Sequence, residues 1–91
     1  AYLDFLVDEL ESGEPDEEFI FSFLGALAQI FFIFKTSPFS VQQNTLLSSI
    51  LLIIHDQSLD LNRFSYCGSD IHHSSEQLLL LFDRFEPGSD D

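Results

Sequence analysis

Four side chains that can ligate a metal ion lie close together in the second half of the chain: Cys67, Asp70, His72 and His73. Thiolate, imidazole and carboxylate groups are all zinc ligands. The spacing C-x-x-D-x-H-H matches none of the common closed zinc sites, and adjacent histidines on a helix point about 100° apart. We therefore interpret Asp70 as a helix N-cap and the histidines as solvated, and we predict no metal site and no cofactor.

Motifs of catalysis are missing from the sequence. It contains no G-x-S-x-G, no glycine-rich phosphate loop, no H-E-x-x-H and no C-x-x-C pair. His55 and Asp56 could form half of an acid–base pair, but neighbours at i and i+1 on a helix diverge, and no nucleophile accompanies them. We predict a protein that is not an enzyme.

The carboxylates are the remaining candidates for function. Sixteen Asp and Glu residues face three Lys and Arg residues, which gives a formal net charge of −13. Such a field repels nucleic acid and anionic lipid headgroups, so we expect no direct nucleic-acid binding. It favours a basic protein partner, although excess acid is also an ordinary way of keeping an apolar protein in solution. The net charge alone is compatible with both interpretations.

The most apolar part of the chain is Phe19 to Phe34, a run of sixteen residues with six phenylalanines and no charge. The fold must bury this run and so determines where the acidic residues lie. A run that is apolar on every side is either the central helix of a bundle or a membrane segment. This run and the next one, 41–54, are shorter than the roughly 20 residues needed to span a bilayer, and their flanks are acidic. These features favour the bundle, with a membrane-inserted hairpin over 19–54 as the less favoured alternative.

Turn and cap signals divide the chain into helices. Pro15 suits the first position of a helix, and Ser40 with Gln43 fits a capping box. The prediction is an all-α fold, a small antiparallel bundle of four helices in a single domain spanning 1–91, with 87–91 as a mobile acidic tail. The four predicted helices cover about 1–11, 15–35, 41–56 and 71–86.

The acidic N-terminal segment and the single cysteine indicate the cellular compartment. The first eighteen residues hold eight of the sixteen acids, and no basic region precedes the apolar run, so we expect no signal peptide. Cys67 alone cannot form an internal disulfide, and nothing requires an oxidising compartment. We expect a cytoplasmic protein.

In an antiparallel bundle, the first turn and the connection after the third helix lie at the same end. Acids cluster at both places, so we predict one acidic face that docks a cationic protein. The alternative is two solvated ends without a partner. The candidates from charge alone are Glu14, Asp16, Glu17 and Glu18 at the first turn. Around the third connection lie Asp56, Asp60 and Asp70, which could share the same acidic face.

The order of these features resembles the bacterial colicin-type, colicin D-like immunity proteins, a family of small acidic helical proteins. The segment LDFLVDELESGEPDEEF (Leu3 to Phe19) is similar to that family's opening helix, short Ser-Gly break and acidic entry into the second helix. The segment LDLNRFSYCGSDIHHSSEQLL (Leu59 to Leu79) is similar to its aspartate–tyrosine turn, acidic loop and final helix. The resemblance implies an inhibitor that occludes the basic, RNA-binding cleft of a nuclease toxin, with Asp60, Tyr66 and Asp70 as contacts.

A second class of function stays open. The chain could be a helical adaptor or subunit whose apolar face, rather than its acidic one, binds a partner, and a homodimer through an apolar helix surface is part of this alternative.

Overall fold

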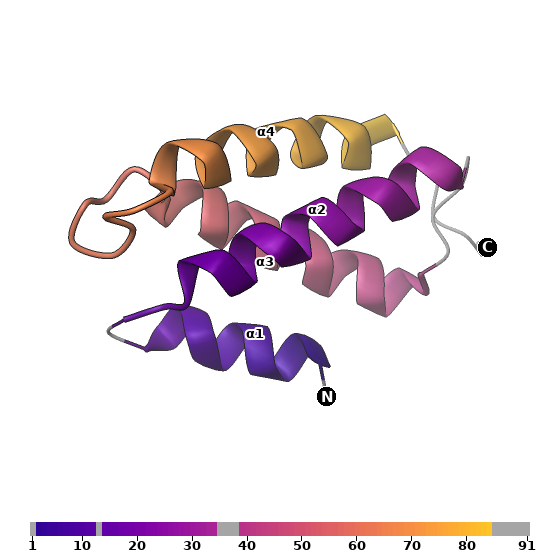
Figure 1. Cartoon of the computed structure of the whole chain (residues 1–91). Helices are drawn as coiled ribbons and strands as arrows, with labels where there is room; N and C mark the ends of the chain where they lie inside the picture. The colour runs from indigo at the N-terminus through magenta and orange to yellow at the C-terminus, as the bar shows by residue number, and fades with distance from the viewer. Residues whose placement is uncertain (1, 13, 35–38, 85–91) are drawn as a thin grey trace.

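The computed structural model describes residues 2–12, 14–34 and 39–84, and within these ranges it contains helices and no strand. The helices are α1 (Tyr2–Glu11), α2 (Glu17–Ile33), α3 (Val41–Gln57) and α4 (Gly68–Arg84). Successive helices run in opposite directions, with α2 and α3 crossing between α1 and α4 (Figure 1). The prediction of a small all-α antiparallel bundle is confirmed.

Helix α2 begins at Glu17, two residues later than predicted. Asp16 is its N-cap, and the Asp16 Oδ1 atom accepts a hydrogen bond from the Phe19 backbone N–H at 3.1 Å. Pro15 is therefore not the first helical residue; it precedes the cap and is buried. Glu17 and Glu18 occupy the first turn, where negative charge is favourable beside the helix dipole. The predicted end at residue 35 lies outside the described residues.

Helix α3 begins with the predicted capping box. The Gln43 N–H donates to Ser40 Oγ and the Ser40 N–H donates to Gln43 Oε1, both at 3.1 Å. These two bonds satisfy two donors that a helix N-terminus otherwise leaves unpaired.

Helix α4 begins three residues earlier than predicted, at Gly68. The Ile71 N–H already donates to the Cys67 carbonyl at 3.0 Å, so helical hydrogen bonding starts from Cys67. The interpretation of Asp70 as an N-cap was wrong, because Asp70 lies within the first turn. The predicted end at 86 and the tail 87–91 lie outside the described residues.

The hydrophobic core lies between α4 and the crossed pair α2 and α3, since α4 packs against both and α1 packs against α3. Only one face of α2 is enclosed, although its sequence is apolar on every side. Phe23 and Phe31 are buried, whereas Phe32 is 92% exposed. The predicted central helix is therefore enclosed on one face only, because α4 is the main helix that packs against α2. The core residues are Leu6, Leu10, Ile20, Phe23, Leu24, Leu27, Phe31, Leu47, Ile50, Leu51, Ile54, Phe64, Ile71 and Leu78.

None of the helices in the described ranges 2–12, 14–34 and 39–84 combines the length and the apolar character needed to cross a membrane.

Candidate acidic docking site

Two segments meet at one end of the bundle: the turn between α1 and α2, and the connection 58–67 between α3 and α4 (Figure 1). The connection contains a tight turn in which the Phe64 N–H donates to the Asp60 carbonyl at 2.8 Å. The Phe64 side chain is fully buried and anchors this segment in the core. The antiparallel arrangement thus places the predicted acidic segments at the same end.

Glu17 joins these two segments directly. Its Oε1 atom accepts hydrogen bonds from the backbone N–H groups of Tyr66 at 3.0 Å and Cys67 at 2.7 Å. Its Oε2 atom accepts from the Ser65 N–H at 3.0 Å. We call this set of three bonds the Glu17 clasp. It attaches the connection 58–67 to the first turn of α2.

The clasp also sets the charge state of Glu17. Burial acts to raise the pKa of the carboxyl, but the N–H donors of Cys67, Tyr66 and Ser65 together outweigh burial and hold the pKa below its ordinary value of 4.5. The carboxylate form accepts these bonds, so binding them favours ionisation. Glu17 is therefore a structural residue whose oxygens already have donors.

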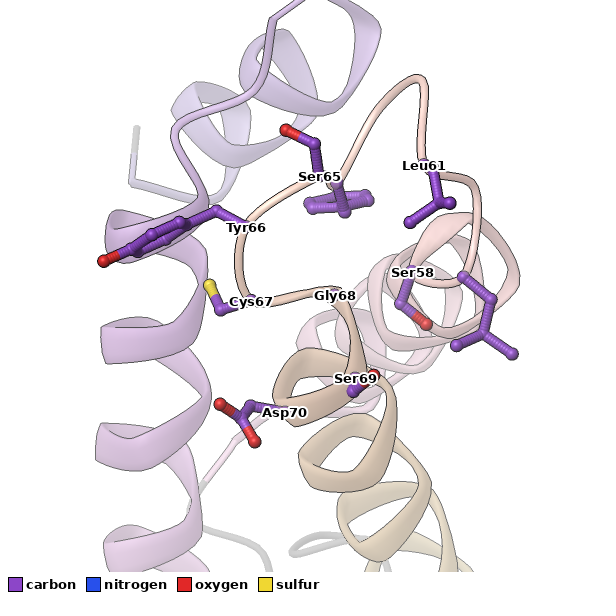
Figure 2. Close-up of a pocket in the computed structure, with 10 residues that line it drawn as sticks. Ser58, Leu61, Ser65, Tyr66, Cys67, Gly68, Ser69 and Asp70 are labelled. Carbon is purple, nitrogen blue, oxygen red and sulfur yellow. The ribbon is translucent and has the colours of Figure 1, made fainter.

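A small pocket lies on the connection itself. It has a volume of about 170 Å³ and is lined by residues between Ser58 and Asp70, including Leu61 and Tyr66 (Figure 2). Pockets for small-molecule ligands usually measure about 300–1,000 Å³. The ring of Tyr66 extends out of the loop in Figure 2, and its side chain is 81% exposed. The end of the bundle is thus better suited to surface contact than to enclosing a ligand.

The charges of three carboxylates act on the thiol of Cys67. Burial raises the pKa of its thiol, and the negative charges of Glu17, Asp70 and Glu18 raise it further. Glu17 and Glu18 come from the first turn of α2, whereas Asp70 comes from the first turn of α4. The structure therefore brings acids from both predicted groups together. It also leaves Cys67 as a free thiol in an electronegative setting, which disfavours the reactive thiolate.

The other predicted contacts are exposed and lie on the same segments. Asp16 caps α2, and Asp60 Oδ1 accepts a hydrogen bond from the Asn62 N–H at 2.9 Å, so each has one oxygen in use. Glu14 lies in the first turn between helices, and Asp56 lies in the last turn of α3. These four side chains are solvent-facing, as a docking contact requires.

Arg63 was missed as a structural residue by sequence reasoning. Its Nε atom donates to Gln57 Oε1 at 3.1 Å, and its Nη2 atom donates to the Leu10 carbonyl in the last turn of α1. A cation at a helix C-terminus is favourable. Arg63 therefore ties α1 to the same connection that Glu17 holds, and no local sequence pattern indicates this contact.

The side chains that could bind a metal ion in the structure are not the four that lie close together in the sequence, Cys67, Asp70, His72 and His73. In the described part of the chain, the group of three within mutual reach is His55, His72 and Glu76, and it includes neither Cys67 nor His73. From the sequence, His55 is placed only beside Asp56, as half of an acid–base pair.

Comparison with known proteins finds no matching family model, no matching curated protein and no matching solved structure.

Proposed function

We propose that this chain is a non-enzymatic acidic binding protein, an immunity protein that neutralises a basic nuclease-type toxin by occluding its active site. The observation that carries the proposal is the Glu17 clasp, which fixes the connection 58–67 against the start of α2. The clasp presents exposed acids from two distant stretches of sequence on one end of the bundle.

The mechanism is electrostatic. A cleft that binds nucleic-acid phosphates offers Lys and Arg side chains, and a surface with a net charge of −13 attracts them over long range. The clasp holds the backbone beside Tyr66, so less conformational entropy is lost when a partner binds. Tyr66 is 81% exposed and supplies an aromatic anchor among carboxylates, and tyrosine is enriched in the residues that dominate binding energy.

The proposal is tested with a basic nuclease-type toxin domain, which should first be sought in the reading frames adjacent to this gene. The purified chain is titrated into an RNA-cleavage assay of that domain, and both proteins are also co-expressed to measure survival. We expect stoichiometric inhibition, protection from toxicity and an affinity that falls steeply as salt rises. Unimpaired cleavage in the presence of excess chain would exclude the proposal for that domain.

Charge reversal tests whether the two acidic segments act as one face. The pair Glu14→Lys with Asp70→Lys, one residue from each segment, should slow association with the toxin domain at low salt by at least tenfold, since steering depends on local charge. The matched control is Asp4→Lys with Asp83→Lys, which changes the net charge equally near the start of α1 and the end of α4, away from the two acidic segments. Stopped-flow association rates distinguish them, and equal slowing by both pairs would refute a localised acidic interface.

A second candidate function is supported by exposed apolar surface. Phe32 and Ile33 at the end of α2 are 92% and 70% exposed. A groove of about 400 Å³ also lies between α2 and α3, lined by Phe23, Ala26, Leu27, Ile30, Phe39, Gln43 and Leu47. We infer that, if the acidic end binds nothing, the chain acts as a helical adaptor through the apolar face around Phe32 and Ile33 at the end of α2, which binds a partner or a second copy.

Sedimentation of the isolated chain separates the two candidates. An adaptor self-associates through the apolar face, and Phe32→Ser should abolish that association, whereas Leu61→Ser, at a residue 76% exposed in the connection 58–67, should not. An inhibitor of the proposed kind keeps its oligomeric state in both variants, and its partner binding weakens with salt.

A further inference from the structure

We propose that His55, His72 and Glu76 form a binding site for a transition-metal ion such as Zn²⁺, between the end of α3 and the first half of α4. Each side chain offers one ligand atom, and these atoms all lie within 4.8 Å of one another. The proposal is independent of the proposed function, because it concerns a different group of residues and requires no partner protein.

The fold places the three ligands on facing surfaces. His72 and Glu76 are separated by four residues on α4, so they lie on the same side of that helix. His55 belongs to the last turn of α3, which packs against α4. The two imidazole rings are stacked, with centroids 4.2 Å apart and planes inclined by 26°. Packing of α3 on α4 thus joins residues that are far apart in sequence.

One nitrogen in this group lacks a partner. His55 Nε2 is buried and has no hydrogen bond with any residue that the structure describes. A buried polar atom left unpaired costs about 1–3 kcal/mol, so native proteins rarely keep one without a reason. A bound metal ion would satisfy this nitrogen. The neighbouring imidazole and carboxylate are both groups that share a metal ion with histidine in proteins.

Ser58 determines which ring nitrogen of His72 carries the proton in the neutral imidazole. Its hydroxyl is fully buried and donates to the His55 carbonyl at 2.8 Å, which uses its only proton. The 2.9 Å bond between Ser58 Oγ and His72 Nδ1 must therefore be donated by the His72 Nδ1–H. In a neutral ring, this arrangement leaves the lone pair on Nε2. A hydrogen bond from the other ring nitrogen is the usual second contact of a metal-binding histidine.

The donor set indicates the kind of metal. Two imidazoles and one carboxylate suit Zn²⁺ and its neighbours in the first transition series better than Mg²⁺ or Ca²⁺, which prefer oxygen ligands throughout. Ligand atoms of a tetrahedral zinc site are about 3.4 Å apart, so ligand atoms 4.8 Å apart have to approach each other by about 1.4 Å. The stacked imidazole rings also have to turn, so that an in-plane lone pair of each ring points at the ion. Glu76 is exposed and its long side chain can move. Three protein ligands leave a fourth position open.

The test uses Zn²⁺ alone as the probe, on chelator-treated protein in physiological salt with excess Mg²⁺ to occupy scattered surface carboxylates. We expect one equivalent of Zn²⁺ to bind by calorimetry and to raise the thermal unfolding midpoint, since an ion that binds the folded state stabilises it. Substitution of Co²⁺ should give the visible absorption of a four-coordinate site. Failure of Zn²⁺ to shift the midpoint would overturn the proposal.

Variants separate a built site from diffuse binding to an acidic surface. Glu76→Gln, at an exposed position that leaves the fold intact, should weaken Zn²⁺ binding by at least tenfold, and His55→Gln should weaken it similarly. His73→Gln is the matched control, because His73 adjoins His72 on the chain but is exposed and lies outside the group. Equal affinities for the Glu76→Gln and His73→Gln proteins would overturn the site.

Discussion

A Glu17→Gln variant is expected to lose about 1–3 kcal/mol of unfolding free energy at neutral pH, because hydrogen bonds to a charged acceptor are stronger than bonds to a neutral one. The wild-type carboxylate accepts three backbone N–H bonds from a segment almost fifty residues further along the chain. Glutamine keeps one acceptor oxygen and replaces the other with a donor, which faces donors in the clasp. Urea unfolding at constant temperature measures the loss.

The stabilisation that Glu17 provides should decrease in acid. The folded-state pKa of Glu17 lies below its ordinary value of 4.5, so the clasp contributes its full stability above about that pH. The contribution disappears as the pH falls through the lowered folded-state pKa and the carboxylate becomes protonated. The stability difference between wild type and Glu17→Gln should therefore be constant from neutral pH to about pH 5 and shrink in stronger acid.

Glu18→Gln provides the control, since it removes the same charge from the same helical turn at an exposed position outside the clasp. Its effect on stability should be within about 0.5 kcal/mol of zero, as for most surface substitutions. If the two variants unfold at the same urea concentration at neutral pH, the clasp contributes nothing and the connection 58–67 is held by other contacts.

The clasp also sharpens the proposed interface. Both Glu17 oxygens already accept hydrogen bonds, so a partner that contacts Glu17 directly has to share these oxygens with the clasp and weakens it. The exposed acids around it can meet a partner without such a cost. A fall in toxin affinity for Glu17→Gln would then reflect a loosened connection 58–67. It should come with increased amide exchange at Ser65 to Cys67, whereas loss of a contact at Asp60 would leave that exchange unchanged.

The helices could be predicted from sequence because their signals are local. The capping box needs only Ser40 and the residue three positions later, and it is present as predicted. The common end of the two acidic segments follows from the antiparallel order of four helices. Burial of α2 was harder to predict, because an apolar sequence does not show how many neighbours a helix has. Phe32 remains exposed for that reason.

The interactions that define the site are non-local, and this explains why sequence reasoning missed them. The favourable interaction with the helix dipole already accounts for an acid at position 17. The sequence therefore gives no sign that the Glu17 carboxylate binds the backbone N–H of Cys67. His55 and His72 meet because α3 packs on α4, while sequence proximity favoured His72 with His73. Gly68 lies outside the predicted fourth helix, 71–86, although its small size permits α4 to begin there.

Gly68→Ala should destabilise the fold by about 1–3 kcal/mol, the usual effect of forcing an extra carbon into a packed interior. Gly68 is buried where α4 begins, and a Cβ atom there would lie 2.4 Å from the Ser58 carbonyl oxygen and 3.2 Å from Phe64 Cβ. The backbone oxygen cannot rotate away as a side chain can, so α4 must shift from the end of α3. Thermal and urea unfolding measure the effect.

Gly25→Ala is the matched control, because the same substitution in the middle of α2 places its Cβ in open space with nothing within 4 Å. Alanine has the higher helix propensity, so this variant should gain about 0.5–1 kcal/mol. The two substitutions add the same methyl group to a helix and should move stability in opposite directions. A gain at both positions would mean that α4 does not approach Ser58 closely. The connection 58–67 would then lack the tight packing on which the proposed docking face and the proposed metal site both depend.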